Sequence, residues 1–370
     1  MSTTITAAVS RITGQPFSLE TLELEDPRDN EVLVRIVATG ICHSDLHMRN
    51  APDRVPKPIV LGHEGAGVVE RVGKSVKKVQ PGDHVVITFD SCGACPNCTQ
   101  GHAAYCQFLR RHAFSGARAD GSTALSCNGE VIHSHFFGQS SFAGYSICTE
   151  RNVVPVDRTL PLSLLGPLGC GIQTGAGAMI NSLKVGAGDR VAVLGSGSVG
   201  LAGVMAAHVA GAATIVAVDP QANRLALAEQ LGATHTLKST DGDLLSQLQA
   251  IAPQGFNAIL DTTGHDGLIK QAVAALAAFG VCGLVNTVSG ADIHANILDL
   301  VRGGRSVRGI HQGDSVPEIF IPKLIELFKQ GRFPFDKLIR FYDFADINQA
   351  MADMHAGTTI KPVIRISPEP

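Results

Sequence analysis

Four cysteines crowd into one loop of the chain, "SCGACPNCTQGHAAYC", at residues 91–106. If the loop folds back on itself, it could bring four thiolates around one tetrahedral ion; they belong to Cys92, Cys95, Cys98 and Cys106. Four thiolates leave zinc no open position, which is typical of a structural site. An iron centre would also suit them. The alternatives are disulfides, which a reducing compartment disfavours, and unrelated buried thiols, which the density of the cluster disfavours.

A second set of possible ligands is spread over three segments, "GICHSDLH", "LGHEGAG" and "GPLGCGIQTG". The set consists of Cys42, His43, Asp45, His47, His63, Glu64 and Cys170. Zinc held by one cysteine, one histidine and a second cysteine keeps its fourth position for water or substrate. This set, unlike the cysteine loop, could therefore take part in a reaction.

Three glycines in "VAVLGSGSVGLAGVMAAHVAGAATIVAVD" form a candidate phosphate-binding turn. Gly195 permits a tight turn, Gly197 lets the backbone approach a pyrophosphate, and Gly200 allows a helix to lie close to a sheet. The motif alone is weak evidence, because such glycines can merely pack a βαβ unit. Here a strand precedes it, a helix and a second strand follow, and that strand ends at an acidic residue. The sequence therefore predicts a dinucleotide site with the phosphates at the helix N-terminus.

The acidic residue, Asp219, bears on which nicotinamide cofactor binds. A carboxylate accepts hydrogen bonds from a ribose 2′-hydroxyl but repels a 2′-phosphate at the same place. Arg224, just beyond, argues the opposite, because arginine can receive a phosphate. We expect NAD rather than NADP from the acidic position of the fingerprint.

Two patterns of elements must position these residues. Up to about residue 170, short β-rich runs such as "EVLVRIVATG" and "DHVVITF" alternate with turn residues, which is typical of an all-β body. From about residue 186, strands alternate with amphipathic helices, which predicts a parallel sheet wound on both faces. In that stretch "LIKQAVAALAAFG" (268–280) has the pattern of a helix and "VCGLVNTV" (281–288) that of a strand. A helix at "VPEIFIPKLIELFKQG" and a strand at "KPVIRIS" follow.

The composition is that of an ordinary soluble globular protein. The chain has 370 residues, of which 45% are hydrophobic and 17% charged, and a formal net charge of -3. This length suits two domains, since one usually holds about 100–200 residues. Acidic and basic residues are mixed along the chain, so there is no electrostatic footprint for nucleic acid or an anionic membrane. We expect small-molecule partners instead.

The N-terminal stretch "MSTTITAAVSRITG" lacks the basic start and apolar core of a secretory signal, so we expect a cytoplasmic protein with reduced cysteines. The apolar segment "LAGVMAAHVAGAATIVAVD" is almost long enough to span a membrane. His208 and Gly211 interrupt it, and its second half is rich in β-branched residues. A helix, a turn and a buried strand are therefore expected instead.

The chain resembles the zinc-dependent medium-chain alcohol dehydrogenases over essentially its whole length. The zinc signature "GHEGAGVVERVGKSV", the cysteine loop, "GPLGCGIQTG" and "GSGSVG" follow in the family's order and spacing. Within the family it is most similar to bacterial aryl-alcohol (benzyl alcohol) dehydrogenases, through "VATGICHSDL", "HSHFFGQSSFA" and "GRFPFDKLIRFY". The resemblance implies an α/β protein with a GroES-like, partly open β-barrel catalytic domain over 1–171 and 312–370. It also implies a Rossmann NAD-binding domain, a doubly wound parallel sheet, over 172–311.

The resemblance assigns roles to the possible ligands. Cys42, His63 and Cys170 would bind a catalytic zinc ion, and Glu64 could approach the metal when ligands exchange. Asp45 would orient the imidazole of His63, as buried carboxylates do for zinc ligands. The cysteine loop would hold a structural zinc ion, which makes two zinc ions per chain.

The resemblance also implies a proton relay and further cofactor contacts. Ser44 would hydrogen-bond the substrate alcohol and pass its proton by way of the cofactor's ribose hydroxyls to His47, although His47 could instead be a surface residue. His43 stands where many relatives carry an arginine that faces the pyrophosphate. The remaining cofactor contacts would be Thr174 beside the nicotinamide, Val199 in the glycine turn and Arg365 near the phosphates.

The implied reaction is reversible oxidation of a primary alcohol to an aldehyde, with hydride transfer to NAD. By the resemblance the substrate pocket would contain Thr88, Phe136, Phe137, Thr287 and Ile310. This mainly apolar lining favours aromatic primary alcohols such as benzyl alcohol. Phe136 and Phe137 could equally be core residues of a strand, because buried aromatics usually are.

Alternatives remain at the level of substrate and of function. Allylic terpenoid alcohols such as geraniol, other primary alcohols and the glutathione adduct of formaldehyde are rival substrates. A catalytically inactive nucleotide-binding relative is the alternative that is not an enzyme, and the intact set of Cys42, His63 and Cys170 argues against it. Members of the family form homodimers or homotetramers, and the sequence does not choose between them.

Overall fold

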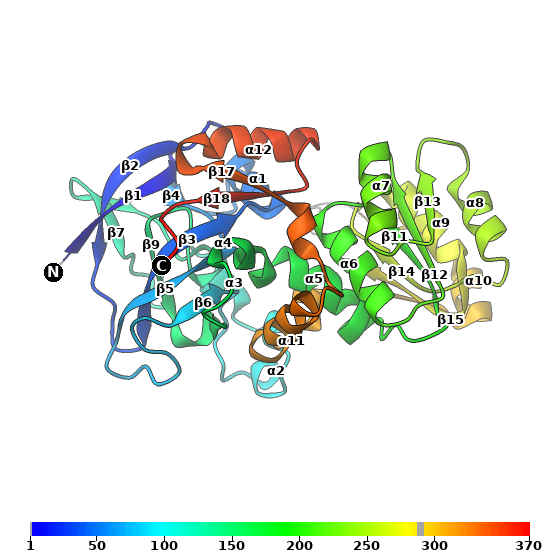
Figure 1. Cartoon of the computed structure of the whole chain (residues 1–370), viewed down its shortest axis with the longest axis horizontal. Helices are drawn as coiled ribbons and strands as arrows, with labels where there is room; N and C mark the ends of the chain where they lie inside the picture. Colours follow the sequence, from blue (N-terminus) through cyan, green and yellow to red (C-terminus); the bar gives the residue numbers. More distant parts are fainter. Residues whose placement is uncertain (1, 287–291) are drawn as a thin grey trace. The chain divides into compact units, whose positions relative to one another are not determined.

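The computed structural model describes residues 2–286 and 292–370. The chain divides by compactness into two units (Figure 1). The first comprises Met1–Cys170, Val316–Pro322 and Asp336–Pro370, and the second comprises Gly171–Ser315 and Lys323–Phe335. The domain limits inferred from the sequence stay a prediction.

The first unit is built mainly from two β-sheets, as its short β-rich runs predict. One sheet has five strands in the order β4-β1-β2-β7-β8; the other has seven, in the order β10-β6-β5-β3-β18-β17, with β9 also paired to β3. The strands are β1 (Ser2–Ser10), β2 (Ser18–Glu25), β3 (Glu31–Gly40), β4 (Ile59–Val60), β5 (Gly65–Val72), β6 (His84–Ile87), β7 (Leu125–Cys127), β8 (Glu130–Ile132), β9 (Tyr145–Thr149), β10 (Val153–Pro155), β17 (Ile339–Asp343) and β18 (Lys361–Arg365). The helices are α1 (His43–Asn50), α2 (Pro96–Thr99), α3 (Leu109–Ala113), α4 (Leu162–Leu165) and α12 (Ile347–Ala356).

Strand β3 lies at the centre of the larger sheet. Its run "EVLVRIVATG" is buried at nearly every position, which explains its almost continuous apolar character. It pairs antiparallel with β5, β9 and β18. In the pairing with β18, Val363 lies opposite Gly40, so the start of β18 comes next to the chain that leads into α1.

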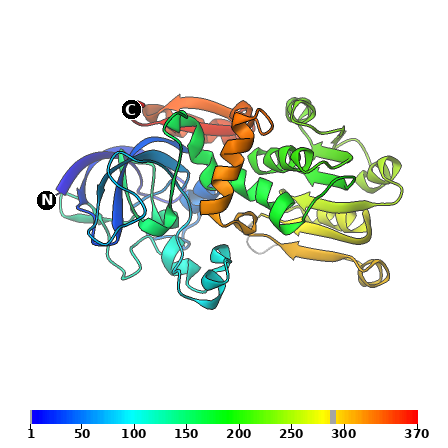
Figure 2. The same ribbon diagram turned by 60° about the horizontal axis from the view of Figure 1, so that its bottom comes forward.

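The second unit is a parallel sheet wound on both faces. Its strands follow the order β13-β12-β11-β14-β15-β16, which is the Rossmann order 3-2-1-4-5-6. Figures 1 and 2 show helices on both sides of this sheet, with α6 and α7 on one side and α8 and α9 on the other. The strands are β11 (Arg190–Leu194), β12 (Thr214–Asp219), β13 (His235–Lys238), β14 (Phe256–Asp261), β15 (Leu276–Leu284) and β16 (Ser306–Gly309). The helices are α5 (Gly171–Gly177), α6 (Ser198–Val209), α7 (Ala222–Gln230), α8 (Leu244–Ile251), α9 (Asp266–Ala274) and α10 (Ile297–Gly303).

Helix α11 (Pro317–Lys329) contributes residues to both units. The predicted fold class, a GroES-like body with a Rossmann sheet, is confirmed. So is the expectation that the apolar segment after Gly200 forms a helix, a turn and a strand, because α6 ends at Val209 and β12 starts at Thr214. Among residues 2–286 and 292–370, no helix is both long enough and apolar enough to cross a bilayer.

One predicted helix is too long. We expected a helix over 268–280, but α9 ends at Ala274 and Leu276 already opens β15. The alanine- and leucine-rich residues after 274 favour a helix by propensity, yet their pairing with β14 prevails. The register shifts between Phe256 and Ala258, and Phe279 has a φ of 62°, so the strand bulges here.

Candidate functional site

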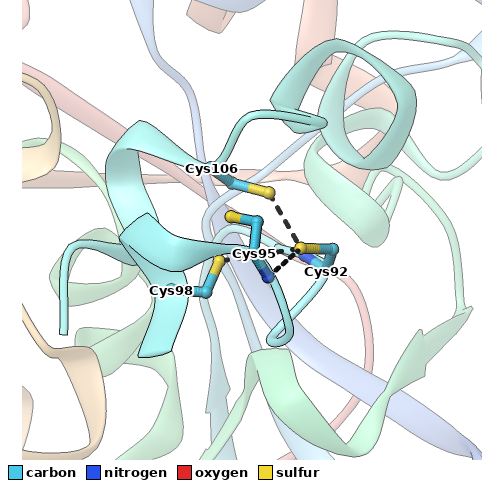
Figure 3. A group of neighbouring side chains, drawn as sticks. All are labelled: Cys92, Cys95, Cys98 and Cys106. Carbon is cyan, nitrogen blue, oxygen red and sulfur yellow. Dashed lines mark hydrogen bonds between the residues drawn. The ribbon is translucent and has the colours of Figure 1, made fainter. Parts of the chain in front are cut away.

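The four cysteines of the loop lie together in the first unit, around the short helix α2. Their sulfur atoms all lie within 4.8 Å of one another, and they point toward a common centre (Figure 3). The Sγ atoms of Cys92 and Cys98 are 3.9 Å apart, close to the ~3.8 Å that two sulfurs have across a tetrahedral zinc ion with Zn–S bonds of about 2.3 Å. All nine cysteines belong to the described part of the chain, and none of them forms a disulfide.

Backbone N–H groups favour thiolates in this loop. The N–H groups of Ala94 and Cys95 donate to Sγ of Cys92 at 3.5 and 3.3 Å. Backbone hydrogen bonds from Cys98 and Gln107 lower the pKa of Cys95 to about 6, whereas burial raises the pKa of Cys106 to about 12. These hydrogen bonds favour ionisation of one thiol of the loop, and a bound cation would favour ionisation of the other three.

The second group of ligand atoms also lies within the first unit. One atom from each of Cys42, His63, Glu64 and Cys170 lies within 4.8 Å of the other three. Cys42 precedes α1, His63 and Glu64 lie between β4 and β5, and Cys170 follows the turn Gly166–Gly169. Three distant segments therefore place two sulfurs, an imidazole and a carboxylate around one point.

Asp45 fixes the orientation of His63. Its Oδ1 lies 3.0 Å from Nδ1 of His63 and accepts the N–H of Gly62, while its Oδ2 accepts the N–H of Cys42 at 3.0 Å. The other ring nitrogen of His63, Nε2, is buried and has no hydrogen bond with any described residue. An imidazole held at Nδ1 with a bare Nε2 has the arrangement of a histidine ligand supported by a carboxylate.

The electrostatics of the group favour a cation. Burial disfavours the imidazolium, yet Asp45 and Cys42 raise the pKa of His63 to about 10. The hydrogen bond between the two thiols lowers the pKa of Cys42 and raises that of Cys170, since one proton is shared between them. Positive charge is therefore stabilised between these side chains, as a bound metal ion would require.

Glu64 is paired with a buried lysine, Lys361, that no sequence motif indicates. Nζ of Lys361, the first residue of β18, donates to both carboxylate oxygens of Glu64 at 2.9 Å. Burial raises the pKa of Glu64, and the ammonium of Lys361 opposes that rise. The signal in the sequence is slight: a lysine that opens an otherwise apolar strand.

The relay residues lie on α1. Oγ of Ser44 is 3.8 Å from Sγ of Cys42, so Ser44 lies next to the ligand group. His47 and His43 are exposed. Positions 44 and 47 are three residues apart on a helix and so share a face. The relay through His47 stays a prediction.

The predicted pocket residues of the first unit pack around the ligands. Phe136 and Phe137 are buried in a 3-10 turn rather than a strand. The ring of Phe137 stacks on that of His63 with centroids 4.3 Å apart, and Phe136 meets His63 edge-on at 5.3 Å. Thr88 is buried, and its hydroxyl donates to the carbonyl of Gly169, next to Cys170. In the second unit Ile310 is buried, and Thr287 lies outside the described residues.

The glycine turn of the second unit joins β11 to α6. Gly195 has a φ of 91°, and a Cβ on Gly200 would meet the carbonyl oxygen of Gly195 at 1.8 Å, so both positions require glycine. A Cβ on Gly197 would meet no described atom within 4 Å. Gly197 precedes the first helical residue, and no side chain caps the helix there. Val199 lies in the first turn of α6. The backbone thus leaves room for a phosphate at this helix N-terminus.

Asp219 ends β12 beside this turn. It is 2% exposed; one carboxylate oxygen accepts the N–H of Ser196 at 2.8 Å, and the other accepts that of Gln221 at 2.9 Å. Nη1 of Arg224 lies 3.7 Å from the same carboxylate. Asp219 thus helps to hold the glycine turn.

Two further predicted cofactor residues have different surroundings. Thr174 is buried in α5 of the second unit. Arg365, in β18 of the first unit, is exposed, and its guanidinium lies 4.0 Å from the centroid of the Phe341 ring. Their contacts with a cofactor stay a prediction.

Known proteins are similar to this chain over nearly its whole length. The family model described as alcohol dehydrogenase GroES-like domain matches residues 28–158, and that described as zinc-binding dehydrogenase matches 198–330. Geraniol dehydrogenase of Castellaniella defragrans is 45% identical, over 97% of this chain and 96% of its own.

Two solved structures are similar throughout. An alcohol dehydrogenase zinc-binding domain protein from Burkholderia ambifaria is 50% identical, with a TM-score of 0.98 and 100% of both chains covered. Benzyl alcohol dehydrogenase from Acinetobacter calcoaceticus is 44% identical, with a TM-score of 0.96, and the match covers 99% of this chain and 100% of that one. The ligand group, the glycine turn and these relatives lead to one conclusion: the chain belongs to the zinc-dependent medium-chain alcohol dehydrogenases.

Proposed function

We propose that this alcohol dehydrogenase oxidises aromatic primary alcohols to aldehydes, reversibly, with NAD as hydride acceptor. Its active site is the group of Cys42, His63 and Cys170. The observation that carries the proposal is the bare, buried Nε2 of His63, held toward two cysteine sulfurs by the Asp45 carboxylate. Other buried histidines, such as His135, also have a ring nitrogen without a partner, but among the described residues only at His63 do the sulfurs of two cysteines lie within 4.8 Å of the ligand nitrogen.

The donor set fits zinc with one open position. Two thiolates and an imidazole are three of the ligands that zinc prefers, and the fourth place remains for substrate. Zinc there would polarise the substrate hydroxyl as a Lewis acid and lower its pKa. The cysteine loop fits a second, closed zinc site that fixes the fold of residues 91–106.

Side chains of α1 would move the proton. Ser44, whose hydroxyl lies 3.8 Å from the sulfur of Cys42, would accept the hydroxyl proton of the alcohol. The cofactor's ribose hydroxyls would link Ser44 to His47, which is exposed and would pass the proton to solvent. In aldehyde reduction the same groups would return a proton to the product oxygen. Asp45 would keep its hydrogen bond to Nδ1 of His63 in both directions of the reaction.

The second unit would bind the dinucleotide. The open space at Gly197 and the uncapped N-terminus of α6 suit a pyrophosphate. His43, Thr174, Val199, Arg224 and Arg365 are the further contacts that we propose. Nicotinamide would accept the hydride, and the Asp219 carboxylate favours the free 2′-hydroxyl of NAD over the 2′-phosphate of NADP.

Two relatives bear on the substrate. One is named a benzyl alcohol dehydrogenase and the other a geraniol dehydrogenase. The rings of Phe136 and Phe137 next to His63 support an aromatic substrate, because a ring–ring contact adds about 0.5–1.5 kcal/mol to burial. Thr88, Thr287 and Ile310 complete the lining that we propose. The 45% identity to the geraniol enzyme makes allylic terpenoid alcohols the second candidate.

Initial rates with benzyl, cinnamyl, geranyl and short aliphatic alcohols, each with NAD and with NADP, test the proposal together with zinc analysis. We expect the highest kcat/KM for benzyl alcohol with NAD, and two zinc ions per chain. Faster turnover of geraniol would favour the second candidate. Faster turnover of ethanol would refute the pocket argument, a preference for NADP would refute the Asp219 argument, and one zinc ion per chain would leave only the structural site.

The chain also presents a surface suited to self-association as a homodimer or homotetramer. Strand β16 is the outermost strand of the parallel sheet, and α10 packs beside it against β15. Phe279, Ile297 and Val301 on β15 and α10 are 84%, 76% and 74% exposed. An open strand edge next to exposed apolar side chains favours pairing with a second copy. Light scattering coupled to gel filtration would give the mass of the assembly.

A further inference from the structure

Lys361 is the buried cation of the candidate active site. Its side chain is 1% exposed, and Nζ donates to Oε1 and Oε2 of Glu64 at 2.9 Å and to the carbonyl oxygen of Ile41 at 3.0 Å. All three donor positions of the ammonium are therefore used within the protein. Strand β18 fixes this position, because Val363 pairs with Gly40 of β3.

Glu64 is held beside the ligands in a space made for its carboxylate. A Cβ on Gly40 would meet Oε2 of Glu64 at 2.0 Å, so only glycine leaves room there. A carboxylate oxygen of Glu64 lies within 4.8 Å of the ligand atoms of Cys42, His63 and Cys170. Only a small movement would therefore bring this oxygen to the open fourth position of a metal bound by those three residues.

The charges explain what prevents that movement. A metal bound here would face two thiolates together with the carboxylates of Glu64 and Asp45, four negative charges against two positive ones from a divalent ion. Lys361 supplies a further positive charge directly on Glu64. Without it, the buried carboxylate would lose the ammonium that contacts both of its oxygens, which is costly, and a metal held by the neighbouring ligands would offer a replacement cation.

We infer that Lys361 is a positioning residue: its ammonium holds the Glu64 carboxylate away from the fourth metal position and so keeps that position open to substrate. The inference rests on the proposed metal site at Cys42, His63 and Cys170. It adds a residue from β18 that makes no contact with the reacting atoms and acts through Glu64.

Cobalt substitution tests this without measuring turnover. Co²⁺ replaces zinc and gives visible absorption bands that change when an external ligand enters an open position. Imidazole is the probe, and only the open site responds to it, because the four-cysteine site is closed. The variants are Lys361→Met, Lys361→Arg and the double variant Lys361→Met/Glu64→Gln. Arg118→Met is the matched control, because Arg118 forms another buried pair in the first unit, with Glu31.

We expect the Kd for imidazole to rise at least about tenfold in Lys361→Met, which is ~1.4 kcal/mol. It should return to within about threefold of wild type in Lys361→Arg, which restores the charge, and in the double variant, which removes the competing carboxylate. Arg118→Met should leave it unchanged. A wild-type Kd in Lys361→Met would overturn the inference, as would a double variant as weak as the single one. If the wild-type protein itself shows no imidazole-sensitive cobalt, the proposed function fails instead.

Discussion

The orientation of His63 by Asp45 can be tested by changing one atom. Both carboxylate oxygens of Asp45 form hydrogen bonds. Oδ1 accepts the N–H of Gly62 and bonds with Nδ1 of His63, and Oδ2 accepts the N–H of Cys42. Asparagine offers one oxygen and one NH₂ group at the same size. In either orientation of the amide, its NH₂ faces at least one buried N–H group, so a hydrogen bond is lost and two donors oppose each other.

The expected magnitudes follow from that count. A buried donor without a partner costs about 1–3 kcal/mol, so the free energy of unfolding of Asp45→Asn should fall by that amount. Removing the carboxylate that supports a zinc-bound histidine typically costs about 10–100-fold in metal affinity. We expect a loss of this size at the Cys42, His63 and Cys170 site alone.

Competition with a chromophoric chelator measures zinc affinity, and urea unfolding measures stability. Asp266→Asn is the control, because Asp266 also pairs with a histidine, His294, but on the surface of the second unit. That variant should keep wild-type zinc affinity at both sites. If Asp45→Asn binds zinc as tightly as the wild-type protein, Asp45 does not govern the ligand and the reasoning is wrong.

Two further predictions concern the glycine turn and pH. Gly200→Ala should lower the free energy of unfolding by about 1–3 kcal/mol, because its Cβ would overlap the Gly195 carbonyl. Gly197→Ala should instead weaken NAD binding with little loss of stability, because its Cβ would occupy the space proposed for the phosphate. Urea unfolding measures the first effect and calorimetric titration with NAD the second, and equal losses of stability in the two variants would contradict this prediction. Burial, assisted by Arg118, lowers the pKa of His135 from 6.5 to about 3. Below pH ~6.5, His135 is therefore protonated in the unfolded chain but stays neutral in the folded protein. As the pH falls from ~6.5 to about 3, the free energy of unfolding should decrease by at most ~1.4 kcal/mol per pH unit. His135→Asn should reduce this acid slope, and an unchanged slope would show that His135 is not its source.

Much of the fold and the ligand group can be predicted from local patterns. The cysteine loop, the glycine turn and the alternation of strands and helices can each be recognised within a short segment of sequence. The structure also brings Cys42, His63 and Cys170 together, as the resemblance implies. The pairing of Glu64 with Lys361 has no such signal, because strand pairing between β3 and β18 creates it. Likewise, the early end of α9 depends on the pairing of β15 with β14, which no local propensity records.

The edge of β3 has a consequence for synthesis on the ribosome. Residues 38–40 pair with β18, whose residues are translated only after the entire Rossmann sheet has been made. Until then the nascent chain carries a long apolar strand with part of one side unsatisfied, a state that favours association with other chains. Chaperone dependence should therefore arise from the first unit, while the largely contiguous second unit can fold as it emerges.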